Sequence, residues 1–429
     1  MMANHLTEAA IRIVGGQPLQ GKIAISGAKN AALKLMAASL LTDQPLVLDN
    51  VPQLLDTVTM AELLTHHGVE LSQQDHRWTL QTRDIRTTDA CFDLVRKIRA
   101  SIVILGPLLA RCGHVKMPFP GGDAIGSRNI DYHLQGLRQL GAEVRFEEGF
   151  ILADAPHGLH GTVMNFPNVT VTGTENVVMA ACLAKGTTVL HNVAREPEVV
   201  DLIHCLNAMG AQISGAGTAT LTIEGVTSLN GTQRRVIPDR IEVGTYAVAA
   251  AMTGGELELI GANPQHLAAE LECLRRAGVT VLEQPTGITV QADRSLLQGV
   301  DILTDPYPGF ATDLQAQFMA LMTVAGGAAM VTETIYENRL RHVPELQKLG
   351  ANITVHKDSA LVRGVAKLHG TTVSATDIRA SVSLVLAGLV AAGETLVLQP
   401  YHLDRGYEKL VEKLAMCGAK IERVEPASA

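Results

Sequence analysis

Hydrophobic and polar positions repeat along the chain in a unit of about 70 residues. In each unit a helical segment ends at a glycine, followed by a small or β-branched residue, any residue, and Val, Ile or Leu. A glycine in this place is typical of a residue that ends a helix and leads into a strand. The six glycines, with steps of 73, 69, 68, 72 and 68 residues between them, are Gly68, Gly141, Gly210, Gly278, Gly350 and Gly418.

A second marker keeps the same period. In the first unit Leu41–Gln44 precedes a β-rich run, and in the others a glycine does so: Gly113, Gly186, Gly255, Gly327 and Gly393. The two markers predict six repeats, each with the order helix, strand, helix, strand, strand. A period this long indicates a small subdomain per unit, so we expect an α/β protein whose repeats group as three and three around two cores. The polar stretch Ser228–Arg235 after the third unit is the predicted linker.

Composition narrows the class of protein. With one Trp, six Tyr and seven Phe, the core must be aliphatic, and the net charge of −8 argues against a nucleic-acid partner. The six cysteines show neither a CxxC pair nor metal-ligand spacing, which is typical of free thiols in a reducing compartment. The first ten residues lack the apolar core of a signal peptide, and no apolar run is long enough to span a bilayer. We therefore expect a cytoplasmic protein with no membrane partner, no metal and no cofactor.

Charged side chains recur where the first helix of a unit is expected to begin. Lys29, Arg99 and Arg379 lie there in three units, and Asp313 lies there in the fifth. Equivalent positions in equivalent units predict that these side chains emerge at the same end of each core, where helix N-termini favour anions.

Two further arginines, Arg128 and Arg405, follow the glycine that opens the β-rich run of their unit by 12 to 15 residues. With Lys29, Arg99 and Arg379 they predict a cradle for a phosphate or carboxylate. Taken singly, each cation is more typical of a surface salt bridge.

The stretch Pro118–Arg128 contains paired prolines and glycines, which exclude a regular helix or central strand. This predicted loop carries one carboxylate, Asp123, and its glycines would let it approach a ligand and close over it. The alternative is a solvated turn with an incidental charge.

Seven segments of the chain match the motifs of one family. They resemble the UDP-N-acetylglucosamine 1-carboxyvinyltransferases, and the resemblance runs from about residue 11 to about residue 424. The segments are Ser26–Ala31, Ile98–Ile102, Gly121–Arg128, Thr312–Phe318, Thr332–Arg339, Arg379–Ser381 and Tyr401–Tyr407.

The resemblance implies a fold of two inside-out α/β barrel domains, each of three repeats around buried helices, with an active-site cleft between the domains. It places the catalytic loop in a domain of residues 21–235, and assigns residues 1–20 plus 236–429 to the second domain.

The resemblance also implies a reaction: transfer of enolpyruvyl from phosphoenolpyruvate to the 3′-hydroxyl of UDP-N-acetylglucosamine with release of phosphate, by addition and elimination. This is the first committed step of peptidoglycan synthesis. By the same resemblance, phosphoenolpyruvate would be held by Lys29, Arg128, Arg379 and Arg405, with Arg99 nearby. The nucleotide sugar would be held by Asn30, Asp131, His133, Asp313 and Ile335. The catalytic residues would be Asp313 as base, Asp123 as acid, and Lys29.

Asp123 departs from the family pattern, because most members carry a cysteine there, which fosfomycin alkylates. The sequence therefore predicts insensitivity to fosfomycin. Cysteine and aspartate both hold and donate a proton, although their ordinary pKa values are about 8.5 and about 3.9. An acidic role near neutral pH would need the pKa of Asp123 raised by burial or anionic substrates, against the nearby cations. Smaller departures are Asn129-Ile130 for the usual Pro-Val and Lys34 for the usual Pro.

Two other functions compete with this reading. The sister enzyme of the same fold transfers enolpyruvyl to shikimate 3-phosphate, but the Gly-Gly-Asp loop and the region of Arg339 match the nucleotide-sugar enzyme. A non-catalytic paralogue that binds a UDP-sugar and regulates wall synthesis is the second alternative. It would be expected to have lost several charged residues, whereas all the other matched ones are present.

Overall fold

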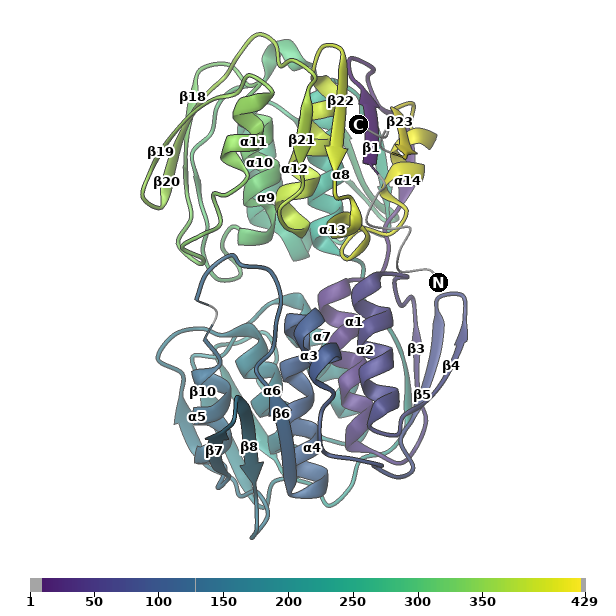
Figure 1. The fold of residues 1–429 in the computed structure, drawn as a ribbon, viewed down its shortest axis with the longest axis vertical. Helices are drawn as coiled ribbons and strands as arrows, with labels where there is room; N and C mark the ends of the chain where they lie inside the picture. The colour runs from purple at the N-terminus through teal and green to yellow at the C-terminus, as the bar shows by residue number, and fades with distance from the viewer. Residues whose placement is uncertain (1–9, 128, 426–429) are drawn as a thin grey trace. The chain divides into compact units, whose positions relative to one another are not determined.

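The computed structural model describes residues 10–127 and 129–425, which form two compact units (Figure 1). In these described ranges the first unit comprises residues 10–26, 124–127 and 238–425, and the second comprises residues 27–123 and 129–237. Each unit contains three repeats of helix, strand, helix and two strands, except that in the sixth repeat a single strand follows the second helix and the N-terminal β1 (Ala10–Val14) completes the sheet. The predicted six-repeat α/β architecture is confirmed.

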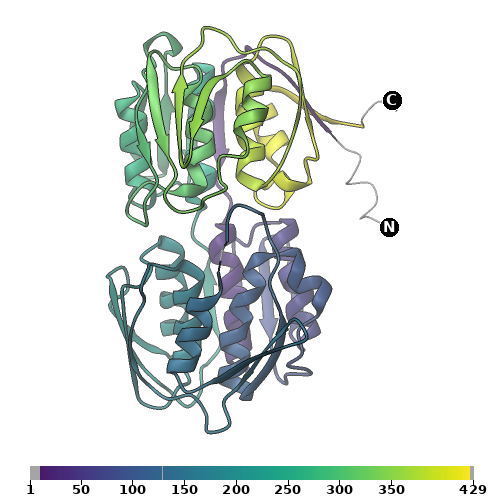
Figure 2. The same cartoon turned by 60° about the vertical axis from the view of Figure 1, so that its left-hand side comes forward.

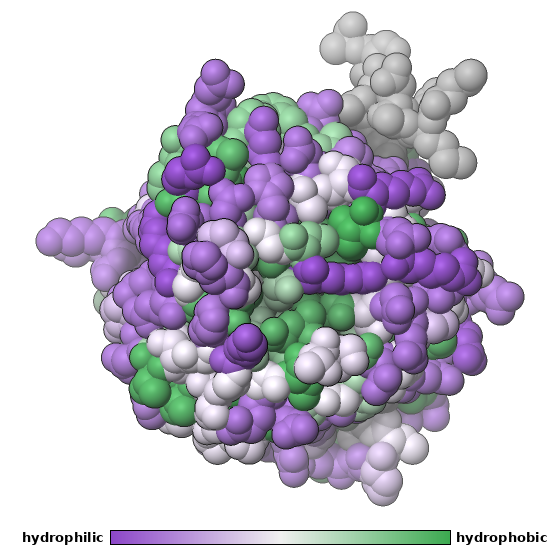
Figure 3. All heavy atoms as spheres, turned by 90° about the horizontal axis from the view of Figure 1, so that it is seen from below, coloured by the Kyte–Doolittle hydropathy of each residue, from purple (hydrophilic) through white to green (hydrophobic). Residues whose placement is uncertain are grey.

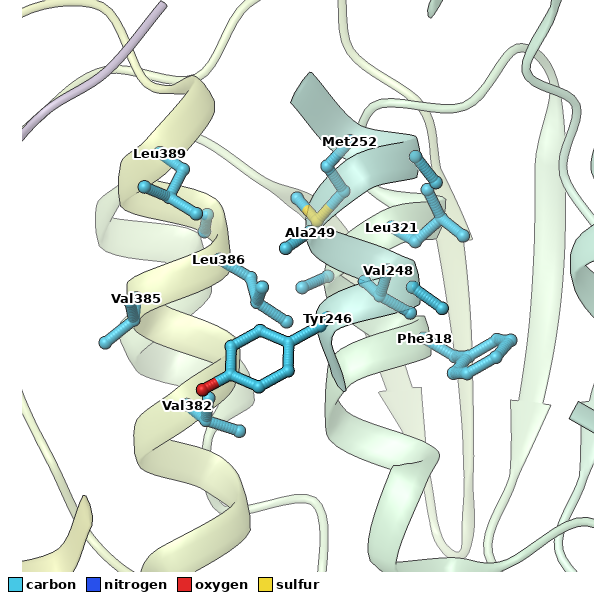
Figure 4. Close-up of a cluster of buried hydrophobic side chains, with 14 of the residues drawn as sticks. Tyr246, Val248, Ala249, Met252, Phe318, Leu321, Val382, Val385, Leu386 and Leu389 are labelled. Carbon is cyan, nitrogen blue, oxygen red and sulfur yellow. The ribbon is translucent and has the colours of Figure 1, made fainter. Parts of the chain in front are cut away.

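Three helices form the centre of the first unit, and nearly all their residues are buried. Such helices must be apolar on every side, and α8 and α12 achieve this with Ala, Val, Leu and Met. Figure 4 shows the side chains of Tyr246, Phe318 and Leu386 gathered from the three helices. Their bounds are α8 (Arg240–Thr253), α10 (Gln315–Met322) and α12 (Ile378–Val390).

The second unit has the same plan, with buried helices at its centre and amphipathic helices outside. Its central helices are α1 (Lys29–Ala38), α4 (Leu105–Cys112), which continues from the 3-10 helix η2 (Arg99–Ile104), and α6 (Val171–Ala181). The outer helices of the two units are α2 (Leu55–His66), α5 (Asp131–Gln139), α7 (Pro197–Ala208), α9 (Ala268–Arg276), α11 (Val343–Lys348) and α14 (Leu410–Met416). Shorter helices are α3 (Phe92–Lys97), α13 (Tyr401–Asp404) and the 3-10 turn η5 (Thr312–Leu314).

The strands of each unit form three separate sheets, seen from a second side in Figure 2. In the first unit one sheet has the order β15 (Thr280–Gln284), β16 (Gly287–Gln291), β14 (Glu256–Ile260), β2 (Gln20–Ala24). The second sheet has the order β17 (Ile302–Leu303), β18 (Ala328–Thr332), β20 (Ser359–Arg363), β19 (Asn352–His356). The third has the order β21 (Thr372–Ser374), β22 (Glu394–Leu398), β1 (Ala10–Val14), β23 (Lys420–Val424).

In the second unit one sheet has the order β13 (Thr232–Arg235), β3 (Leu46–Asp49), β5 (Arg77–Gln81), β4 (Glu70–Gln74). The second sheet has the order β6 (His114–Pro118), β8 (Phe150–Asp154), β7 (Glu143–Glu147). The third has the order β11 (Gln212–Ser214), β12 (Thr220–Glu224), β10 (Thr187–His191), β9 (Val163–Asn165). The six predicted capping glycines all have left-handed φ, between 90° and 108°. They end the outer helices as expected.

Two short strands are exchanged between the halves of the sequence. β2 precedes α1 along the chain but pairs in parallel with β14, and β13 precedes α8 but pairs in parallel with β3. The predicted linker at Ser228–Arg235 is therefore wrong, because its second half is β13. The chain passes from one unit to the other after Ser26 and after Ile237, and the loop residues 124–127 also belong to the first unit. β2 lies in a sheet of the first unit.

The surface seen in Figure 3 is mostly hydrophilic, with hydrophobic residues in small groups among polar ones. Among the described residues, no helix is long and apolar enough to cross a membrane.

Each unit buries a lysine–glutamate pair among its helices. Lys34 Nζ lies 3.4 Å from Glu175 Oε2 in the second unit, and Lys413 pairs with Glu242 in the first. Burial raises the pKa of Glu175 to about 7; Lys34 opposes this shift, while Glu198 and Glu196 add to it.

We expect Glu175→Gln to change how stability depends on pH. The Glu175 carboxyl has a pKa of about 7 in the folded protein and about 4.5 in the unfolded chain. Between these two pH values the folded protein holds a proton that the unfolded chain releases. The wild type therefore loses stability as the pH rises through this range. Glutamine at position 175 cannot titrate. The free energy of unfolding of the variant, relative to that of the wild type, should therefore rise by up to about 3 kcal/mol between the lower and the upper end of this pH range. Urea unfolding at several pH values measures this, with Glu283→Gln at an exposed ion pair as the control. Parallel curves for Glu175→Gln and wild type would contradict it.

Candidate functional site

Several of the predicted site residues lie in the first turn of a helix. Lys29 is the first residue of α1, Arg99 is the first of η2, and Asp313 is the second of η5. Arg379 is the second residue of α12, whose first N–H groups are capped by Asp377 Oδ1. The predicted site residues that the structure describes fall into two groups, one in each unit.

In the first unit Asp313 is held between two guanidinium groups, and we call these three residues the Asp313 cluster. Arg339 Nη2 donates to Asp313 Oδ1 at 2.7 Å. Arg379 donates from Nη2 and Nε to Oδ2 at 3.0 and 3.2 Å. The arginine side chains are 7% and 5% exposed, whereas that of Asp313 is 25% exposed. Opposite charges at this distance favour the ionised carboxylate.

Arg379 is further fixed by aromatic and backbone neighbours. Its guanidinium lies 5.4 Å from the centre of the Tyr407 ring. Burial lowers the pKa of Arg379, but the attraction of Tyr407 and Asp313 outweighs burial and raises it above its ordinary value. A Cβ at Gly406 would lie 3.7 Å from Arg379 Nη1. The half-buried Arg405 follows α13 and is next in sequence to Gly406, where an added side chain would approach Arg379.

Glu333 ties the segment that carries Ile335 and Arg339 to the same cluster. Its Oε1 accepts from the N–H groups of Ile335 and Tyr336 at 2.9 and 3.2 Å. Its Oε2 accepts from Thr312 Oγ1 at 2.8 Å, and the same Thr312 oxygen accepts from Arg339 Nη1. The buried carboxylate of Glu333 thus links the backbone at Ile335 to Thr312, the residue before Asp313. The motif Thr332–Arg339 was noted in the sequence, but the role of Glu333 was not predicted, because a single glutamate in a motif does not reveal its partners.

In the second unit Lys29 is buried beside a carboxylate. Its Nζ lies 3.2 Å from Asp56 Oδ2, and both side chains are less than a tenth exposed. A buried ammonium keeps its charge when it is paired in this way. Asn30 follows in the first turn of α1 and is half-buried.

The glycines of the loop let it pass close to the start of η2. A Cβ at Gly121 would lie 1.7 Å from the Arg96 carbonyl oxygen, and one at Gly122, whose φ is +109°, would lie 2.8 Å from Arg99 Cβ. Arg99 Nη1 also donates to the Pro120 carbonyl at 3.4 Å. These contacts carry the half-buried Asp123, the next residue, alongside Arg99. The sequence predicted that these glycines would approach a ligand; here they approach the protein's own backbone.

The tip of the loop, residues 124–127, belongs to the first unit. There Ser127 N–H donates to Glu337 Oε1 at 2.6 Å, and Asn338 N–H donates to the Ile125 carbonyl at 3.1 Å. A Cβ at Gly126 would clash with Glu337. Arg128, predicted to hold phosphoenolpyruvate, lies outside the described residues.

Asp131 and His133 share the first turn of α5 but differ in environment. Asp131 is exposed, whereas His133 is 2% exposed. Burial, helped by the charge of Arg99, lowers the pKa of His133 to about 3, so the ring is neutral. Its Nε2 lies 3.1 Å from Thr172 Oγ1 and its Nδ1 lies 3.0 Å from Asn176 Nδ2. Both ring nitrogens of this predicted sugar-binding residue thus face protein partners.

In chemical terms the two groups offer buried cationic side chains, a carboxylate paired with two arginines, and a carboxylate on a glycine-rich loop. Within residues 10–127 and 129–425, no three His, Cys, Asp or Glu side chains are grouped so as to hold a metal ion.

Comparison with known proteins defines the class first. The model of the family EPSP synthase (3-phosphoshikimate 1-carboxyvinyltransferase) matches residues 13–414. The crystal structure of the enolpyruvyl transferase NikO from Streptomyces tendae has a TM-score of 0.88 and 25% identity, covering 98% of this chain and all of that one. The structure of EPSP synthase from Acinetobacter baumannii, with a TM-score of 0.76 and 17% identity, covers 97% of this chain and all of that one, and shares the fold. The fold is that of the enolpyruvyl transferases.

Curated relatives define the family. UDP-N-acetylglucosamine 1-carboxyvinyltransferase from Rhodospirillum centenum is 55% identical over 425 residues, covering 96% of this chain and 98% of the relative. Its namesake from Gluconacetobacter diazotrophicus is 56% identical over 414 residues, with the same coverage. The chain belongs to the UDP-N-acetylglucosamine 1-carboxyvinyltransferase family. The predicted family, two-domain α/β fold and transferase class are confirmed.

Proposed function

We propose that this protein transfers the enolpyruvyl group of phosphoenolpyruvate to the 3′-hydroxyl of UDP-N-acetylglucosamine and releases phosphate. The observation that carries the proposal is the identity of 54–56% over nearly the whole chain with relatives that bear this name. The charged residues described above supply the groups that the reaction needs.

The reaction has two steps. In the addition step the 3′-oxygen loses its proton to a base and bonds to C2 of phosphoenolpyruvate, while an acid gives a proton to the vinyl CH₂. In the elimination step the new methyl group loses a proton, the double bond re-forms, and the C–O bond to phosphate breaks. The acid and the base therefore exchange protons with the substrates in both steps.

We assign the base to Asp313, because its carboxylate is paired with Arg339 and Arg379 and a quarter of the side chain is exposed. The acid is Asp123, whose loop passes over Arg99. Lys29, Arg99, Arg379 and Arg405, together with Arg128, hold the phosphate and carboxylate of phosphoenolpyruvate. Asn30, Asp131 and Ile335 bind the nucleotide sugar.

We also propose that the protein is insensitive to fosfomycin, because position 123 has no thiol for the epoxide to alkylate. The nearest cysteine in sequence, Cys112, ends α4 rather than lying in the loop. Partial burial raises the pKa of its thiol and so reduces the reactive thiolate. Through peptidoglycan synthesis the proposed reaction, which we place in the cytoplasm from the family resemblance, would serve cell shape and cell division.

The direct test is phosphate release from phosphoenolpyruvate in the presence of UDP-N-acetylglucosamine or of shikimate 3-phosphate. We expect steady release with the nucleotide sugar and less than about 1% of that rate with shikimate 3-phosphate, since a binding site built for one polar substrate leaves its groups unpaired with another. Binding of the nucleotide sugar without release would instead support a regulatory paralogue.

A further inference from the structure

A buried asparagine of the second unit makes hydrogen bonds to two helices at once. Asn176 lies on α6 and is fully buried. Its Oδ1 accepts from Gly106 N–H at 2.6 Å, and its Nδ2 donates to the Ile102 carbonyl at 3.1 Å. The second hydrogen on Nδ2 faces His133 Nδ1 of α5 at 3.0 Å.

The first two bonds lie where η2 passes into α4. Ile102 and Gly106 are four residues apart, so the Asn176 amide bonds the carbonyl and the N–H that an unbroken α-helix would join to each other. Pro107 follows and has no N–H to give to the helix. A Cβ at Gly106 would lie 2.5 Å from Asn176 Oδ1 and 2.3 Å from the Asn176 carbonyl oxygen, so only glycine lets the two helices come this close.

The same network fixes the protonation of His133. Because Gly106 N–H needs an acceptor, Asn176 must present Oδ1 to it and therefore Nδ2 to His133. An NH₂ group only donates, so His133 Nδ1 accepts and carries no proton. The proton is on Nε2, which donates to Thr172 Oγ1. This neutral form agrees with a pKa lowered to about 3 by burial and by Arg99.

The network ends within one turn of two proposed substrate-binding residues. Arg99 is three residues before Ile102 in η2, and Asp131 is two residues before His133 in α5. We propose that Asn176 and His133 are positioning residues, which fix the first turns of η2 and α5 and thereby the places of Arg99 and Asp131. This inference rests on the proposed function, and it assigns to His133 a supporting role that does not require contact with the substrate.

The main test is Asn176→Asp, which keeps the shape of the side chain but cannot donate when ionised. We expect KM for both substrates to rise about tenfold while kcat falls less, because the binding residues Arg99 and Asp131 are displaced directly and Asp123 only through the contact of its loop with Arg99. In an Arg99→Ala background the same change should raise KM for phosphoenolpyruvate less than about twofold, since residues that act through one another are not additive. An equal effect in both backgrounds, or an unchanged KM, would overturn the proposal.

Asn207→Asp is the matched control. Asn207 on α7 also bonds one backbone N–H and one carbonyl, both of Ile213, at 2.9 and 2.8 Å, and these two bonds reach neither η2 nor α5. We expect lower stability with KM unchanged. If KM rises as much in Asn207→Asp as in Asn176→Asp, a general loss of stability in the second unit is sufficient to raise KM. That result would overturn the positioning role.

A second pair of variants covers the case in which Asn176→Asp does not fold. His133→Asn retains an oxygen near the place of Nδ1 that can accept from Asn176, whereas His133→Leu does not. KM should be closer to the wild-type value in His133→Asn, and the reverse order would contradict the network.

The ¹⁵N chemical shifts of the His133 ring test the network without any activity. We expect a protonated Nε2 and an unprotonated Nδ1 from about pH 5 to about pH 8, where an ordinary histidine titrates. A proton on Nδ1 would overturn the assignment. If these shifts are as expected but no UDP-N-acetylglucosamine-dependent phosphate release is found, the proposed function fails and the network stands.

Discussion

Replacing Asp313 with asparagine is expected to lower kcat by about 10²–10⁴-fold, the usual contribution of a positioned acid or base. The amide cannot take the proton of the 3′-hydroxyl. It also leaves Arg339 and Arg379 buried without their carboxylate, which should cost on the order of 3 kcal/mol of stability. Initial rates and urea unfolding of the same preparation separate the two effects.

The matched control for this change is Asp301→Asn. Asp301 is exposed and accepts a hydrogen bond from Met330 N–H, away from the Asp313 cluster. It should leave kcat unchanged. If folded Asp313→Asn keeps kcat within about threefold of the wild type, well below the contribution of a general base, another group is the base and the assignment of Asp313 is wrong.

Two changes at Asp123 should have opposite outcomes. Asp123→Asn cannot donate a proton and is expected to lower kcat by about 10²-fold or more. Asp123→Cys restores a group that can hold and donate a proton, so it should remain active and become sensitive to fosfomycin by covalent modification at residue 123. Rates after preincubation with fosfomycin, and peptide mass spectrometry of the treated protein, measure both effects.

Cys112→Ser is the control for the thiol. It should change neither the rate nor the response to fosfomycin, because Cys112 lies at the end of α4. Irreversible inactivation of the wild type by fosfomycin that disappears in Cys112→Ser would assign the reactive role to that cysteine and contradict the account of Asp123.

The repeats were predictable because their signals are local. A glycine with φ near +100° is needed wherever an outer helix turns into a strand, and only glycine adopts this conformation at little cost. The positions of Lys29, Arg99 and Asp313 at helix starts followed from the same period.

The strand exchange was not predictable from local pattern. β2 pairs with residues 256–260, and β13 pairs with residues 46–49. Parallel pairing over such sequence distances is decided by tertiary packing. The polar, Gly-containing stretch Ser228–Arg235 was therefore interpreted as a linker.

The supporting residues of the site could not be predicted from the sequence for a related reason. Asn176 and Glu333 act through hydrogen bonds to backbone groups distant in sequence, and nothing in their own neighbourhood marks them. The one local hint is Gly106 inside a helix, where glycine weakens the helix unless another chain segment must come close. The charged residues were found because the family motifs contain them, but their pairing within the Asp313 cluster needed the structure.

The most direct test of the central claim is to identify the product. The wild-type protein is incubated with phosphoenolpyruvate and UDP-N-acetylglucosamine, and the nucleotide fraction is analysed by NMR and mass spectrometry together with the released phosphate. We expect a vinyl ether at the 3′-oxygen of the sugar, formed in equal amount to phosphate. Phosphate without this ether, or an unchanged nucleotide sugar with intact phosphoenolpyruvate, would contradict the account.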